Sequence, residues 1–82
     1  MLNGKVVGTI VSTRKLEALV GSKFLEVQLY RNGTATEDTI VAIDTVGAGI
    51  GERVLITTGS GARLALPNTS VPSDAAIVGI ID

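Results

Sequence analysis

The 82-residue sequence predicts one small all-β domain over residues 1–82: a five-stranded antiparallel β-barrel with one short helix before the last strand. Five short segments are rich in Val, Ile and Thr, which favour extended backbone, and turn-forming residues bound them. Only one segment, near residue 60, has the start and stop signals of a helix. Closing the sheet into a barrel of the OB-like kind would hide its strand edges.

The first two predicted strands cover residues 5–13, KVVGTIVST, and residues 24–30, FLEVQLY. The second alternates strictly, with Leu25, Val27 and Leu29 on one side and mostly polar residues on the other. This period of two is typical of a strand with one buried face. We therefore expect these three side chains to point into the core.

A hairpin is predicted to join the second and third strands. The Asn-Gly pair in RNGT, residues 31–34, tolerates the positive φ that a chain reversal needs. The third strand is expected over residues 38–44, DTIVAID, which leaves a long tip.

The remaining elements are a fourth strand, a short helix and a fifth strand. RVLITT, residues 53–58, precedes Ser60, whose hydroxyl is expected to cap a helix of one or two turns over residues 61–66. Pro67 should end that helix, and AAIVGII, residues 75–81, forms the last predicted strand.

The composition indicates a subunit of a larger assembly. A domain of this length hides only roughly 60–65% of the surface of its unfolded chain, so its core is marginal. The chain has no Cys and no His, which removes disulfides and the usual zinc ligands as sources of stability. With 45% hydrophobic and 18% charged residues, some apolar surface is expected to lie against other copies or partners.

The charge balance offers no general attraction to polyanions or membranes. Seven basic and eight acidic residues give a net charge of −1. The longest apolar run, AAIVGII, is far shorter than the ~20 residues of a membrane-spanning helix, and the first residues lack a signal-peptide core. A soluble, intracellular protein is therefore expected.

Two glycine-rich loops, VGAGIGE at residues 46–52 and GSGAR at residues 59–63, were tested as phosphate sites. The first runs directly into a strand, and the second has Leu64 where a dinucleotide fingerprint needs Gly or Ala. Neither continues with the Lys-Ser/Thr of a P-loop. Because glycine permits positive φ and close backbone approach, we expect these loops to serve subunit packing. No Ser has a motif that would make it a nucleophile, and without His no catalytic residue is predicted.

Several stretches resemble, in order and spacing, the EutN/CcmL family of bacterial microcompartment vertex proteins. They are VVGTIVSTRK, LVGSKFLEVQL, VAIDTVGAGIGERVLITTGSGAR and VPSDAAIVGIID, and together they cover nearly the whole chain. The most specific segments are D-x-V-G-A-G-x-G-E at 44–52, G-S-x-A-R at 59–63 and P-x-D-A-A at 72–76.

The resemblance implies an OB-like barrel that assembles into a homopentamer and closes the fivefold vertices of a polyhedral shell, either a carboxysome or a metabolosome. It implies no enzymatic activity, cofactor or metal, and its partners would be other copies and hexameric shell proteins in the bacterial cytoplasm. Candidates for the subunit interface or the fivefold axis are Asp44, Gly47, Ala48, Gly49, Gly51, Glu52, Ser60, Arg63 and Asp74.

Some of these residues have two interpretations. Arg63, expected in the first turn of the helix where the dipole disfavours a cation, either contacts a neighbouring subunit or is solvated. Acceptors for it would be Asp44, Glu52 or Asp74. Asp44 and Asp74 both precede turns, so their carboxylates are expected to bond nearby backbone amides rather than a metal.

A module binding single-stranded nucleic acid is the alternative function. Arg14, Lys15 and Lys23 would supply a basic patch, and Phe24 and Tyr30 would supply the only aromatic platforms for stacked bases. Packing is the favoured use of both aromatics. Arg14 and Lys15 are otherwise candidates for contact with neighbouring shell proteins.

Overall fold

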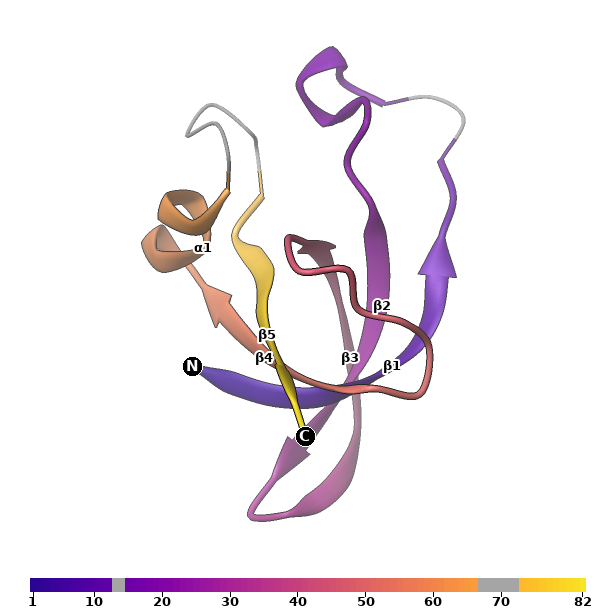
Figure 1. The fold of residues 1–82 in the computed structure, drawn as a ribbon, viewed down its shortest axis with the longest axis vertical. Helices are drawn as coiled ribbons and strands as arrows, with labels where there is room; N and C mark the ends of the chain where they lie inside the picture. The colour runs from indigo at the N-terminus through magenta and orange to yellow at the C-terminus, as the bar shows by residue number, and fades with distance from the viewer. Residues whose placement is uncertain (13–14, 67–72) are drawn as a thin grey trace.

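A computed structural model describes residues 1–12, 15–66 and 73–82, and its strands close into a barrel (Figure 1). Arg14, Pro67, Pro72 and most of the connector before the last strand lie outside the described residues. The elements are β1 (Leu2–Ile10), a 3-10 turn η1 (Glu17–Leu19), β2 (Phe24–Arg31), β3 (Thr34–Asp44), β4 (Arg53–Thr58), α1 (Ser60–Ala65) and β5 (Ala75–Ile81). The predicted five-stranded barrel with one short helix is confirmed.

The barrel order is β1-β2-β3-β5-β4, and one of its pairs is parallel. The predicted antiparallel arrangement holds for the other four pairs, and one parallel pair is unavoidable for a geometric reason. Strand direction alternates around an antiparallel barrel, and an odd number of strands cannot alternate all the way round. The parallel pair is the short seam where Ile43 and Asp44 of β3 meet Ala76 and Ile77 of β5.

The β2–β3 hairpin is tight, which corrects the predicted long tip. Arg31 pairs directly with Thr34, and Asn32 and Gly33 take φ values of 52° and 76°. Positive φ at both central residues is the type I′ geometry, whose twist matches that of the flanking strands. Strand β3 therefore begins at Thr34, four residues earlier than the apolar pattern indicated.

The barrel interior follows the period of two along each strand. Leu25, Val27 and Leu29 are all buried, as predicted from the alternation in β2. The largest fully buried side chains in the described part of the chain come from four strands: Leu25, Ile56, Ile77, Val6, Val27 and Val54.

A second, smaller apolar cluster lies beneath α1. It contains Ile43, Ala62, Leu66 and Ala76, with Phe24 packed against it. The helix is therefore held by its packing against the seam, since six residues are too few to be stable alone.

Helix α1 begins without the side-chain cap that the sequence predicted. Gly59 is the N-cap residue, with φ 63°, and no side chain bonds to the first turn. Ser60 is instead the first helical residue, because Gly59 adopts the left-handed conformation that reverses the chain one position earlier. Arg63 lies in the last turn of the helix and not in the first. In the last turn the helix dipole favours a cation.

Gly4 marks the closest approach of backbone to backbone between β1 and β2. A Cβ atom at this position would overlap the carbonyl oxygen of Gln28 and come within 2.6 Å of Val27 Cγ1. Gly8 on the same strand has its nearest such neighbour at 3.8 Å.

We predict that Gly4→Ala destabilises the fold by about 1–3 kcal/mol, since β1 and β2 must separate to admit the methyl group. Gly8→Ala is the matched control and should change the unfolding free energy by less than about 0.5 kcal/mol. Thermal unfolding of both variants by circular dichroism measures this. Equal stability of the two variants would contradict the close approach.

Candidate functional site

The loop at residues 45–52 is built around the carboxylate of Asp44. That side chain is only 3% exposed, and its two oxygens accept hydrogen bonds from the amides of Val46 at 3.1 Å and Ala48 at 3.0 Å. The predicted turn-forming role of Asp44 is confirmed. Its position is set by β3, whose last residue it is.

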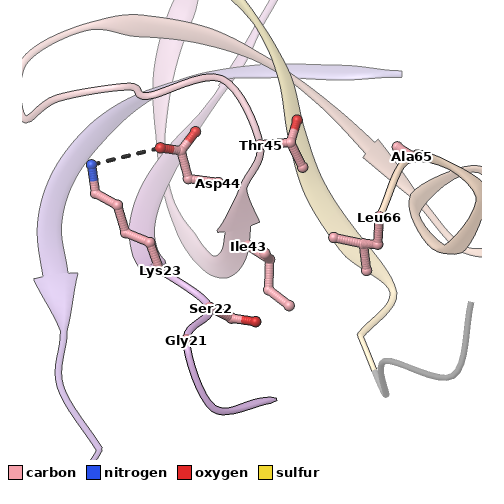
Figure 2. A pocket seen from close by; sticks show the side chains of 8 residues that line it. All are labelled: Gly21, Ser22, Lys23, Ile43, Asp44, Thr45, Ala65 and Leu66. Atoms are coloured by element: carbon pink, nitrogen blue, oxygen red, sulfur yellow. Dashed lines mark ion pairs between the residues drawn. The ribbon is translucent and has the colours of Figure 1, made fainter. Parts of the chain in front are cut away.

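Lys23, which directly precedes β2, also contacts this loop. Its amine donates to the carbonyl oxygen of Ala48 at 2.8 Å and lies 3.6 Å from Asp44 Oδ2 (Figure 2). The sequence placed Lys23 in a possible basic patch and missed this contact. The two residues are neighbours only because β2 and β3 pair, with the Asp44 amide bonded to the Lys23 carbonyl at 2.9 Å.

The end of the loop near β4 forms hydrogen bonds within the loop and to β1. Glu52 Oε1 accepts from the amide of Gly49 at 2.7 Å, and Gly51 donates to the carbonyl of Val6 at 2.8 Å. Gly47 and Gly51 have φ values of 80° and 91°, which explains glycine there, whereas Gly49 does not have positive φ.

The loop amides are therefore engaged by the chain's own oxygens rather than turned outward toward an anion. The loop presents two large apolar side chains to solvent beside the exposed Thr45 and Glu52: Val46 is 41% exposed and Ile50 is 67% exposed. Ala48, an interface candidate, is fully buried and packs in the core of the barrel of its own chain.

The second glycine loop packs on the start of β5. The Gly59 amide donates to the Asp74 carbonyl at 2.8 Å, and a Cβ atom on Gly61 would lie 2.6 Å from Thr57 Oγ1. The expected turn bond of the Asp74 carboxylate is not among the bonds between described residues. Ser73 accepts from the Ala75 amide at 3.4 Å, since a side-chain oxygen in such a turn bonds the amide two residues further on.

Arg63 is exposed and forms no ion pair with a described residue of its own chain. Of its proposed acceptors, Asp44 and Glu52 are occupied by loop amides within the chain. Leu64 beside it is 79% exposed. This end of α1 therefore offers one cation and one large apolar side chain to the outside.

A groove of about 450 Å³ separates the first loop from the end of α1. Figure 2 shows its lining residues: Gly21, Ser22, Lys23, Ile43, Asp44, Thr45, Ala65 and Leu66. Its two charged groups, Lys23 and Asp44, face each other, so the groove holds no free charge for a ligand. Thr45 Oγ1 donates away from the groove to the Ile77 carbonyl, at 2.7 Å across the seam.

Neither aromatic residue is free to stack on a base. Phe24 packs against the cluster beneath α1, and the Tyr30 ring is covered by the guanidinium of Arg53 at 3.9 Å. Lys15 is exposed, and its amine donates to the Ser12 carbonyl at 2.6 Å. The residues considered for nucleic-acid binding do not form a stacking surface.

The described residues contain no group of three or more side chains placed to hold a metal ion. No helix in this part of the chain is long and apolar enough to cross a membrane. Large apolar side chains more than 60% exposed among the described residues are Met1, Val11, Leu16, Val20, Ile50 and Leu64. A small barrel with internally bonded loops and so much exposed apolar surface defines a class of protein: the subunit of a structural assembly.

Comparison with known proteins identifies the family. The family model "Ethanolamine utilisation protein EutN/carboxysome" matches residues 1–82. The chain is 49% identical to the carboxysome shell vertex protein CcmL of Thermosynechococcus vestitus over 95% of this chain and 80% of that protein.

Solved structures agree with the fold. The structure of Gloeobacter violaceus CcmL superposes with a TM-score of 0.95 at 44% identity, covering all of this chain and 86% of the other. The GrpN pentameric microcompartment shell protein from Rhodospirillum rubrum gives a TM-score of 0.90 at 46% identity, covering 100% and 94%.

The chain belongs to the EutN/CcmL family of bacterial microcompartment shell vertex proteins. The predictions of a structural, non-enzymatic shell protein located in the microcompartment shell are confirmed.

We predict that Asp44→Ala destabilises the subunit by about 1–3 kcal/mol, because two backbone amides lose their acceptor and the Lys23 amine loses its ion-pair partner. Glu37→Ala, at an exposed position of β3, is the control and should have little effect. Urea unfolding at one matched subunit concentration measures both. Amide hydrogen exchange should also accelerate at Val46 and Ala48 in Asp44→Ala, and unchanged exchange would contradict the bonding described.

Proposed function

We propose that this chain closes the fivefold vertices of a microcompartment shell as a homopentamer whose rim contacts hexameric shell proteins. The observation that carries the proposal is that large apolar side chains are exposed on the first loop and on α1. Ile50 and Leu64 project from segments that internal hydrogen bonds and packing already hold in place. A preorganised apolar surface loses little entropy when a partner covers it.

The asymmetry of these surfaces is compatible with a ring. The first loop and the exposed residues of α1 are different surfaces of one chain, so a contact between copies through them would be heterologous. A heterologous contact closes into a ring when its rotation divides a full turn. The solved relative GrpN is described as pentameric, which supports a ring of five.

The interface candidates divide into two kinds in this proposal. Asp44, Gly47, Ala48, Gly51 and Glu52 shape the first loop from within, so they act on the interface through the position of Ile50. Candidates for direct contact with a neighbouring copy or with the region near the fivefold axis are Gly49, Ser60, Arg63 and Asp74. The exposed Lys15, with Arg14, is proposed to meet the edges of hexameric shell proteins.

The first test is the subunit count. Native mass spectrometry of the purified chain should show five copies as the dominant species over a wide range of concentration. A stable monomer or a stable hexamer would overturn the proposal. Salt-dependent binding to single-stranded oligonucleotides, measured by fluorescence anisotropy, would favour the alternative module.

The second test separates the interface from the fold. Gly49 does not have positive φ, and a Cβ atom added there would meet only Glu52 Oε1 at 3.4 Å. Gly49→Val should therefore leave the barrel intact. Its larger side chain should weaken assembly by a clash with the neighbouring copy. Arg63→Ala should weaken assembly because it removes a positive charge from the contact. The control is Arg31→Ala, which removes an exposed cation elsewhere.

For both variants we expect a smaller pentamer fraction in native mass spectrometry and an unchanged far-ultraviolet circular dichroism spectrum. If neither Gly49→Val nor Arg63→Ala changes the pentamer or its thermal stability, the proposed roles of these two residues in packing are wrong.

A further inference from the structure

The outer face of the sheet formed by β2, β1 and β4 carries two cations that the described chain does not neutralise. Lys5 of β1 and Arg53 of β4 are direct register partners, so their side chains leave the same face. Like charges opposite one another on neighbouring strands destabilise the pairing. Both residues are half-buried, and neither forms an ion pair with a described residue.

Arg53 is held in place by polar and aromatic contacts. Its Nη2 donates to Asn3 Oδ1 at 2.8 Å, and its guanidinium lies 3.9 Å above the centre of the Tyr30 ring. Its Nε is buried and has no acceptor, the one such side-chain atom in the described part of the chain. The guanidinium is thus held in a fixed position by contacts that leave its charge without an anionic partner, a state that favours an added carboxylate.

The chain's own acids do not supply that acceptor. Glu26 lies on the same outer face of β2, opposite Gly8, and forms no ion pair with either cation. Asp82 follows Ile81, the register partner of Arg53 on β5, and forms none either. The site therefore has two cations, a fixed geometry and no anion from its own chain.

We propose that Lys5 and Arg53 together receive a carboxylate from a second copy of this chain, and this inference rests on the proposed homopentamer. A carboxylate suits the pair because its two oxygens can bond a guanidinium nitrogen and an ammonium group at once. This pair of cations would give the contact between subunits charge complementarity.

A second copy fits the surroundings of the pair better than a small anion. Leu55 and Ile81, each 39% exposed, flank Arg53 on the same face, and a protein surface covers such apolar side chains whereas a small ion does not. The chain also has donors, since Glu17, Glu37 and Asp74 are exposed and unpaired among the described residues. Because the receiving and donating surfaces differ, the contact suits a ring.

The direct test is zero-length crosslinking of the wild-type pentamer with a carbodiimide. An equal mixture of 14N- and 15N-labelled chains is assembled, crosslinked and digested, and the peptides are identified by mass spectrometry. We expect an amide between the Lys5 amine and a carboxylate whose two peptides carry different labels. Lys5 crosslinked only within one chain, or to no carboxylate, overturns the proposal.

Variants provide the second test. Lys5→Gln with Arg53→Gln should raise the subunit concentration needed for half-assembly by about tenfold or more, and Arg31→Gln, which also removes one cation, should not. Wild-type assembly should weaken from about 50 to about 500 mM NaCl, and the double variant should respond less. Because the crosslinking needs only wild-type protein and identifies Lys5 directly, it remains decisive if the double variant does not fold.

The outcomes separate this inference from the proposed function. A wild-type chain that forms no pentamer defeats both. A pentamer that is indifferent to salt and to both substitutions defeats only the carboxylate contact. If the double variant forms normal pentamers but no longer assembles with hexameric shell proteins, the carboxylate belongs to that partner and the second-copy source is wrong.

Discussion

Parity governs this fold: five strands cannot close into a barrel without one parallel pair. That pair, the seam between β3 and β5, has only two residues in register on each strand. The chain compensates for so short a ladder with other bonds, among them Thr45 Oγ1 to the Ile77 carbonyl at 2.7 Å. Asp44 ends β3 at this seam and fixes the first glycine loop, while the cluster containing Ala62 and Leu66 covers the seam from α1.

Local patterns were sufficient for much of the fold. The alternation in β2 placed Leu25, Val27 and Leu29 in the core, because a half-buried strand imposes that period directly on the sequence. The Asn-Gly pair located the hairpin, but the polar start of β3 concealed its length. Thr34 pairs with Arg31 because the turn geometry requires it, although no apolar residue marks the position.

The misses at the candidate site share a physical cause: the decisive contacts join residues far apart in sequence. Lys23 and Ala48 are 25 positions apart, and nothing near Lys23 indicates that its amine will bond the Ala48 carbonyl. The role of Asp44 could be predicted because its bonds to Val46 and Ala48 are local. An Asp side chain before a turn commonly accepts hydrogen bonds from the amides that follow it. Local chemistry was sufficient for Asp44 but not for the Ser60 cap or the Asp74 turn bond, and contacts created by strand pairing required the register.

The glycine-rich loop also shows how a motif that resembles a phosphate cradle serves another purpose. A cradle needs amides turned outward, yet Asp44 and Glu52 draw the amides of the loop inward, and Ala48 fills the barrel beneath. This arrangement uses two of the chain's acids within the loop and turns Ile50 outward. The cations Lys5 and Arg53 are then left without a described partner on a different face. A nearly neutral chain therefore has two unpaired cations on one face, and the proposed carboxylate of a second copy would balance them.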